Sequence, residues 1–509
     1  MSLLGVDVGT TGCKAAAFSE SGGLLGGAYE EYDVQRPQPG WAVLDAAEVW
    51  EKVRRTIRAA AAHTRSDPVR AVCAASMGEA ITPVSSDRRM LGPTILNFDL
   101  RGQEYLEELG QTLPPERLYR TNGNTLGNHY SLTKLKWIRE RQPELYDQAS
   151  CFLLWSGLVS FLLGAEPCVD YSLANRTLLF DLDRGDWSDE LLAWAGLERE
   201  KLPRVVPPGA EIGCLSRTAA AELGLPQGTP ILAGSHDQCA NAVGCGVIAP
   251  GQAVFGFGTY TCVTPVYARR GEAGQMMARG LNTEHHAVPG LFASFIYNLG
   301  GAQVKWFRDT FARAEHLQAK AAGRDVYFDL MAEMPEAPAR VVVLPQMGMS
   351  GPPQFIADAT GVIAGLRLET QRGEILKAIL EGISFDLKAC LDTLPELGLQ
   401  IDEFRAAGGG SKSEAWVQTC ADILGRPFVR VEGGEAGALG AAVTAGVGKG
   451  VFGSFEEAAG AMVRLGRRFE PDPEMHRLYA ARFERYRRLW PLLEDYLREL
   501  YREGLNPER

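Results

Sequence analysis

Residues 3–14 read Leu-Leu-Gly-Val-Asp-Val-Gly-Thr-Thr-Gly-Cys-Lys, an apolar run that carries one acid, Asp7, and then turns through glycines and threonines. A second apolar run, Ala15–Phe18, follows at once, which predicts a β-hairpin with the Gly/Thr segment at its tip. Such a tip offers backbone N–H groups and hydroxyls that suit phosphate oxygens. An acid buried in a strand costs free energy unless a cation or polar groups partner it, and Mg²⁺ near nucleotide phosphates would be such a partner. An ordinary hairpin in which Asp7 accepts backbone hydrogen bonds explains these residues equally well.

Size and composition indicate a large globular protein with two domains. The chain has 509 residues, more than one ordinary core takes up, and 46% hydrophobic and 23% charged residues are typical of globular chains. A formal net charge of -11, without a block of Lys or Arg, argues against a nucleic-acid or anionic-membrane surface. No apolar run approaches the roughly 18–20 residues of a membrane span, and we expect no signal peptide because the first strand begins at Leu3.

The ten cysteines form no CxxC pair and have no histidine partner at metal-ligand spacing. Cys13, Cys73 and Cys262 lie in apolar segments, which favours small core residues over metal ligands or disulfides. We therefore expect a reduced, cytoplasmic location.

Strand-like and helix-like segments alternate along the chain, which predicts an α/β fold. The expected strands include Val69–Ala75, Ile231–Gly234, Ala253–Phe257 and Arg340–Leu344, and the expected helices include Ala46–Ala62 and Leu132–Arg141. Asp45 is a suitable N-cap for the first of these helices. From Pro473 onward, Arg, Glu and Tyr at helical spacing predict a long surface helix or a helix pair.

A second strand, Gly/Thr turn and strand, residues 253–264, echoes the first hairpin just past the middle of the chain. Two phosphate-binding hairpins, one opening each half, predict two related domains that close on one nucleotide. We place these domains at residues 1–246 and 247–509.

Motifs in order along nearly the whole chain, about residues 3–455, resemble the FGGY family of carbohydrate kinases. They are the Asp7–Gly12 turn, Ser131–Ile138, Gly234–Gln238, Gly256–Thr259, Gly361–Leu366 with Glu374–Gly382, and the loops Ala407–Ser413 and Glu435–Ala441. The resemblance implies two ribonuclease H-like (actin-like ATPase) domains with the active site in the cleft between them. The chain departs from the family pattern at His129, before the first signature, and in the loop after Leu344, which lacks the sequence typical of xylulose kinases.

The resemblance implies that Asp237 is the general base. It follows the apolar segment Pro230–Ala233 and Gly234, so its carboxylate should emerge at a strand end, where ligand sites of α/β proteins usually lie. Phosphoryl transfer requires an acceptor hydroxyl that can lose its proton. The alternative is a structural role for Asp237 as the N-cap of a helix that begins at Gln238.

The nucleotide and its metal are assigned to residues from both halves. We expect Asp7 to orient Mg²⁺, and the resemblance implies ATP contacts from Thr10, Thr11, Lys14, Gly258, Thr259, Gly301, Lys305, Gly409, Gly410 and Glu414. The three glycines 408–410 would let the backbone pack on the flat adenine face.

The sugar is assigned to Glu79, His129, Asp237 and Gln238. Gln238 offers both a donor and an acceptor to a polyol. Asp99 and Arg101 resemble a family Asp-x-Arg segment, and an ion pair within the domain is the alternative for them.

These assignments predict an ATP-dependent kinase that phosphorylates a terminal hydroxyl of a xylulose-like ketose, with ATP and Mg²⁺ as cofactors. A glycerol- or erythritol-type polyol kinase is one alternative. An actin- or chaperone-like ATPase without a sugar substrate is another, from a different class. The expected partner is a small sugar, not nucleic acid or membrane, and a homodimer is plausible by resemblance.

Overall fold

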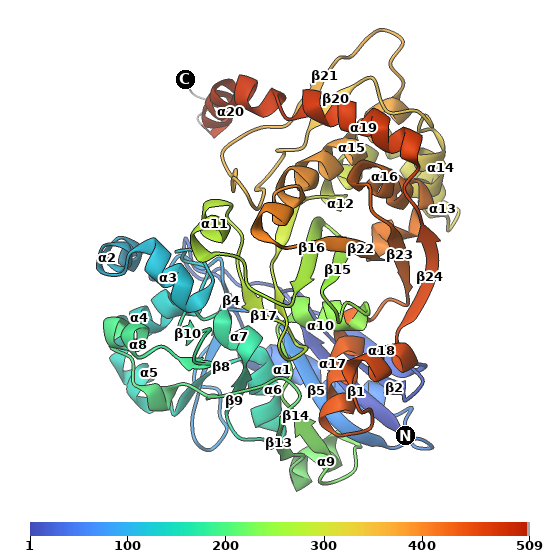
Figure 1. The fold of residues 1–509 in the computed structure, drawn as a ribbon. Coiled ribbons are helices and arrows are strands. Elements are labelled where there is room, and N and C mark those ends of the chain that lie inside the picture. Colours follow the sequence, from blue (N-terminus) through green and yellow to red (C-terminus); the bar gives the residue numbers. More distant parts are fainter. Residues whose placement is uncertain (506–509) are drawn as a thin grey trace.

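The computed structural model describes residues 1–505 (Figure 1). In it, the first hairpin forms as the sequence predicts. Strands β1 (Ser2–Val8) and β2 (Gly12–Ser19) pair antiparallel, with Asp7 opposite Lys14. On its other edge β1 pairs in parallel with β5 (Val69–Ser76). The complete first sheet has the order β13-β14-β5-β1-β2-β3, where β3 is Leu24–Glu31, β13 is Glu211–Cys214 and β14 is Pro230–Leu232.

The second sheet repeats this plan in the other lobe of the molecule (Figure 1). Strands β15 (Gly251–Phe257) and β16 (Tyr260–Tyr267) form the second hairpin, and β15 pairs in parallel with β22 (Ile401–Ala407). The remaining strands of this sheet are β17 (Glu284–His285), β18 (Phe292–Ala293), β19 (Ile296–Leu299), β23 (Phe428–Glu432) and β24 (Arg464–Phe469). A hairpin beside a parallel strand in each sheet is the arrangement expected of two related domains.

Helices cover these sheets where apolar periodicity predicts them. Helix α1 (Ala46–Ala61) is capped by the Asp45 carboxylate and buries Val49, Val53 and Ile57. The other helices used below are α4 (Ser131–Arg141), α7 (Tyr171–Asn175), α10 (Asp237–Gly244), α12 (Gly301–Phe311), α15 (Arg372–Leu391), α16 (Glu414–Leu424), α17 (Ala436–Gly448), α18 (Phe455–Met462), α19 (Pro473–Tyr486) and α20 (Leu489–Leu505). The last two confirm the expected C-terminal helix pair. In the part of the chain that the structure describes, no helix is long and apolar enough to cross a membrane.

Helices α17 and α18 return from the second half of the sequence to pack on the first sheet (Figure 1). Helix α17 crosses α10 with backbone against backbone. A Cβ on Gly440 would lie 1.8 Å from the Ala240 carbonyl oxygen, and one on Gly244 would lie 1.9 Å from that of Ala436. Only glycine permits this approach. The predicted division after residue 246 stays a prediction, and the first lobe also contains residues from the far end of the chain.

The ribbon β17–β18 reaches from the second sheet to the first lobe. Strand β18 pairs with β16, whereas the segment before β17 is bonded to the first lobe. There the backbone N–H of Thr283 donates to the Gly123 carbonyl at 2.7 Å, and the Tyr119 hydroxyl donates to the Leu281 carbonyl at 2.5 Å. This contact carries Glu284, the first residue of β17, into the first lobe.

Candidate active site

Asp237 lies at the carboxyl edge of the first sheet. The backbone N–H of Met77 donates to the Val8 carbonyl at 2.8 Å, and that of Ser76 donates to the Ser235 carbonyl at 3.2 Å. The ends of β1 and β5 and the segment leading into α10 therefore meet. His236 occupies the N-cap position and Asp237 is the first helical residue, so the alternative of Asp237 as the N-cap is wrong.

The side chain of Asp7 is half-buried near Asp237 and lacks a full set of partners within residues 1–505. Its Oδ1 atom is inaccessible and has no hydrogen-bond partner among residues 1–505. Burial and the charge of Asp237 raise the pKa of Asp7 to about 7, against the opposing effect of Lys14. An orphaned carboxylate in an acidic cluster fits a hard divalent cation or its water shell. The alternative, in which Asp7 accepts backbone hydrogen bonds, finds none at Oδ1 within residues 1–505.

In the described part of the chain, the threonine hydroxyls at the tip of the first hairpin have no hydrogen-bond partner, whereas Lys14 is ion-paired. The tip is closed by backbone bonds, with Gly9 N–H donating to Gly12 at 2.9 Å. Within residues 1–505, no hydrogen bond engages the hydroxyl of Thr10 or Thr11. The Nζ atom of Lys14 is 2.6 Å from Glu435 Oε2, so its charge is already matched by an acid from the loop before α17.

The nucleotide residues predicted in the second half fall into one cluster. The N–H of Gly301, at the start of α12, donates to the Gly258 carbonyl at 2.8 Å, and that of Ala302 donates to the Thr259 carbonyl at 3.2 Å. A Cβ on Gly410 would lie 3.0 Å from the Cβ of Phe257, the last residue of β15. The structure therefore brings Gly258, Thr259, Gly301, Gly409 and Gly410 to one end of the second sheet.

Lys305 and Glu414 lie at the margin of this cluster. Lys305 is exposed on α12, one turn beyond Gly301. Glu414 begins α16, and its carboxylate forms ion pairs with Arg467 and, at 3.8 Å, with Arg430. The sequence did not indicate these surface ion pairs, which already engage the Glu414 carboxylate.

Three of the predicted sugar residues adjoin Asp237 or its network. Gln238 Nε2 donates to Asp237 Oδ1 at 3.2 Å. Glu79 is buried with a positive φ of 60°, and its Oε1 accepts from Arg176 Nε at 2.7 Å. His129 is exposed and reaches the network through Tyr130: the two ring centroids lie 3.9 Å apart, and the Arg176 guanidinium lies 5.2 Å from the Tyr130 ring centroid.

Asp99 and Arg101 form the ion pair that was the alternative for them. Arg101 donates to both carboxylate oxygens, at 2.9 and 2.7 Å, and its guanidinium lies 3.9 Å from the Trp41 ring centroid. Both residues are buried, so they stabilise the first lobe internally.

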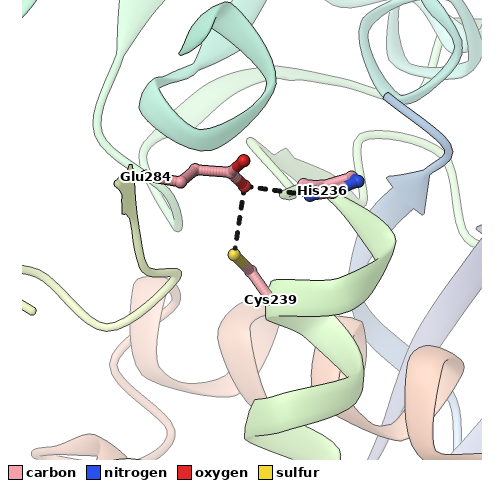
Figure 2. Close-up of side chains that lie close together, drawn as sticks. All are labelled: His236, Cys239 and Glu284. Atoms are coloured by element: carbon pink, nitrogen blue, oxygen red, sulfur yellow. Dashed lines mark hydrogen bonds and ion pairs between the residues drawn. The ribbon is translucent and has the colours of Figure 1, made fainter. Parts of the chain in front are cut away.

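A chain of charged residues that the sequence did not indicate leads to Asp237. Glu284 Oε1 accepts from His236 Nδ1 at 2.9 Å and from Cys239 Sγ at 3.4 Å (Figure 2). His236 Nε2 lies 3.3 Å from Asp237 Oδ1, and Arg176 bridges Glu79 and Glu284. His236 could have been noticed beside Asp237, but nothing local marks Arg176 or Glu284.

The second lobe also faces Asp237. Burial raises the pKa of Cys262 on β16 to about 11, and the charge of Asp237 contributes to the rise. Tyr297 on β19 lies within reach of the charges of Arg176 and Glu79. Asp237 on α10 therefore lies within electrostatic range of a residue of the second sheet.

Family comparisons cover both lobes. The model of the N-terminal domain of the FGGY family of carbohydrate kinases matches residues 2–244, and that of the C-terminal domain matches residues 258–448. An autoinducer-2 kinase of Escherichia coli is 30% identical over 491 residues, which cover 94% of this chain and 92% of that protein. An L-xylulose/3-keto-L-gulonate kinase of Escherichia coli is 26% identical over 505 residues, 97% of each.

Solved structures of xylulose and glycerol kinases have the same fold. A xylulose kinase from Rhodospirillum rubrum superposes with a TM-score of 0.86 at 26% identity, covering 98% of this chain and 100% of that one. A glycerol kinase from Plasmodium falciparum, 19% identical, has a TM-score of 0.83 over 95% of this chain and 97% of that one, which concerns the fold alone. These matches confirm the two actin-like ATPase domains and favour a sugar kinase over an ATPase without a sugar substrate. The chain belongs to the FGGY family of carbohydrate kinases and is an ATP-dependent sugar kinase.

Proposed function

We propose that this kinase transfers the γ-phosphoryl group of ATP to a terminal hydroxyl of a neutral, xylulose-like ketose, with Asp237 as the general base. The observation that carries the proposal is the position of Asp237 at the carboxyl edge of the first sheet, where Gln238 and His236 hold Oδ1. The names of the relatives that act on xylulose or autoinducer-2 support a small sugar.

In the proposed reaction, the hydroxyl oxygen of the sugar forms a bond to the γ-phosphorus while the bond from that phosphorus to the bridging oxygen of ADP breaks. The hydroxyl proton passes to the carboxylate of Asp237. Gln238, beside the base, and Glu79 would bind neighbouring hydroxyls. Glu79 Oε1 accepts both hydrogen bonds from Arg176, and no hydrogen bond within residues 1–505 engages Oε2.

Glycine backbone from the second lobe would hold the nucleotide. Gly258 and Thr259, at the tip of the second hairpin, would face the phosphates, and Gly301 holds that tip against the start of α12. Thr10 and Thr11 would approach the same phosphates from the first lobe. Gly409 and Gly410 would border the adenine, with Lys14, Lys305 and Glu414 as weaker candidates because ion pairs or solvent already engage them.

Asp7 would hold Mg²⁺ or its bound water, as its orphaned Oδ1 indicates. When bound, the metal supplies charge neutralisation at the phosphates. The residues themselves position the reactants, and closure of the lobes would exclude water from the transferring group.

The sugar arm of the proposal is tested by measuring ADP formation across a panel of ketoses, polyols and autoinducer-2. The panel includes both xylulose enantiomers, glycerol, erythritol and 3-keto-L-gulonate. We expect a neutral ketose to give the highest kcat/KM. Highest activity with glycerol or erythritol would favour the polyol alternative, and ATP turnover that no sugar changes would overturn the proposal.

A further inference from the structure

Glu284 comes from the second half of the chain and is linked to Asp237 through His236. Its side chain is fully buried, with 0% exposure, at the start of the ribbon β17. Figure 2 shows one oxygen of its carboxylate directed at both His236 and Cys239, at the start of α10. His236 Nδ1 donates to Glu284 Oε1 at 2.9 Å, while His236 Nε2 lies 3.3 Å from Asp237 Oδ1. One imidazole therefore links Glu284 to Asp237.

The charges around this link leave the imidazole little freedom. Arg176 Nη1 lies 3.6 Å from Glu284 Oε2 and also pairs with Glu79. The backbone N–H of His236 donates to the Ser172 hydroxyl at 2.8 Å. Buried charges are costly unless paired, so this set of partners fixes the ring by its backbone and by both nitrogens.

His236, Cys239 and Glu284 could also be interpreted as a metal site, because their ligand atoms lie within 4.8 Å of one another. The contacts favour hydrogen bonding instead. Oε1 already accepts from both His236 and Cys239, and Arg176 places a positive charge beside Oε2. Burial raises the pKa of the Cys239 thiol well above its usual value, so it remains a protonated donor and not the thiolate that a metal prefers.

We infer that Glu284 is a positioning residue that acts through His236 to hold the carboxylate of Asp237 in its reactive orientation. Asp237 is the base, His236 orients its carboxylate, and Glu284 in turn orients His236. The inference rests on the proposed function, in which Asp237 is the base, and adds a contribution from the second half of the chain.

The ionisation of His236 agrees with this geometry. Burial and the positive charge of Arg176 both lower the pKa of His236. The carboxylates of Glu284 and Asp237 outweigh these two effects and raise the pKa to about 9. The charged groups that act on the ring are Asp237 on α10, Glu284 on β17 and Arg176 after α7. Three further titratable groups lie next to these: Cys239 and Asp170 beside Glu284, and Glu79 beside Arg176. At neutral pH His236 therefore carries a positive charge between the carboxylates of Glu284 and Asp237.

The test is Glu284→Gln in the full-length enzyme. We expect kcat to fall about 10–100-fold, because misplacement of a reacting group has costs of this size, while the KM of the sugar changes less than about 3-fold. The alkaline limb of the kcat profile should move to lower pH, since His236 then loses its proton more easily. Glu381→Gln is the matched control: Glu381 is also a buried glutamate but lies in the second lobe, and turnover should not change.

Two further variants separate the possible outcomes. In an Asp237→Asn background, adding Glu284→Gln should cost little more, because both changes act on one group. His236→Gln removes the same link and should match Glu284→Gln, which keeps the test open if one variant does not fold. Normal turnover of Asp237→Asn would refute the proposed function. A large loss in Asp237→Asn with normal kcat and pH profile in Glu284→Gln, or losses that add fully in the double variant, would overturn this inference alone.

Discussion

The carboxylate of Asp7 lies directly against the backbone of Gly437, where a Cβ would stand 2.2 Å from Asp7 Oδ2. Gly437 belongs to the first turn of α17. The helix that returns from the second half of the chain therefore shapes the pocket of the acid proposed to hold Mg²⁺.

Gly437→Ala should displace Asp7 and lower turnover. A methyl group at that distance cannot coexist with the carboxylate, so kcat should fall about 10²-fold and the Mg²⁺ concentration needed for half-maximal activity should rise. Steady-state kinetics at a series of Mg²⁺ concentrations measures both. The control is Gly434→Ala, since nothing lies within 4 Å of a Cβ there. An unchanged Mg²⁺ requirement in Gly437→Ala would separate Asp7 from the metal.

Asp237→Asn should greatly lower turnover but leave the affinity for the sugar nearly unchanged. The amide keeps the shape of the side chain yet cannot take the hydroxyl proton, so turnover should fall about 10²–10⁴-fold. Sugar affinity, measured by calorimetry, should change much less. Near-normal turnover would show that Asp237 is not the base.

Gly301→Ala should weaken the use of ATP. Its Cβ would lie 2.6 Å from the Gly258 carbonyl oxygen, so the second hairpin tip must shift away from α12. We expect the KM of ATP to rise about 10-fold, equivalent to about 1.4 kcal/mol, with a smaller effect on the KM of the sugar. Gly460→Ala on α18, where a Cβ meets nothing within 4 Å, should behave as wild type. Equal changes in both KM values would argue against a specific nucleotide role.

Acid sugars should be poor substrates. The one guanidinium in the charged network, that of Arg176, is already matched by Glu79 and Glu284, so a substrate carboxylate would meet net negative charge near Asp237. We expect kcat/KM for gluconate and 3-keto-L-gulonate to be at least about 10-fold below that of the best neutral ketose. Comparable values would mean that a cation elsewhere receives the carboxylate.

Stability should fall as pH rises from about 4.5 to 7, in part through Glu381. This buried acid accepts hydrogen bonds from Ala339 N–H and the Tyr479 hydroxyl, and burial raises its pKa from 4.5 to about 7. The folded state therefore binds the proton more tightly than the unfolded state, and the stability it provides at low pH is lost as pH passes through 7. The unfolding temperature of Glu381→Gln should fall less between pH 5 and 8 than that of wild type. The control Glu484→Gln, at an exposed residue, should follow wild type. Parallel curves for Glu381→Gln and wild type would contradict this assignment.

Local patterns predicted the hairpins, the helix at residue 46 and the location of Asp237, because each depends on neighbours within a few residues. The partners of that site were not predictable in the same way. Glu284 is 48 residues from His236, and Arg176 is 97 residues from Glu79, so no periodicity connects them. Similarly, the Ala/Gly composition of α17 does not say on which sheet the helix packs. The homodimer stays a prediction.

The ribbon that carries Glu284 bears on how the enzyme can be divided. A fragment that ended at residue 246 would keep His236 and Arg176 but lose the acid that neutralises both, and it would also lose α17 and α18 from its sheet. The two family domains are therefore not interchangeable modules. A chimera that exchanges one half with a relative must carry a matching acid at position 284 and small residues along α17.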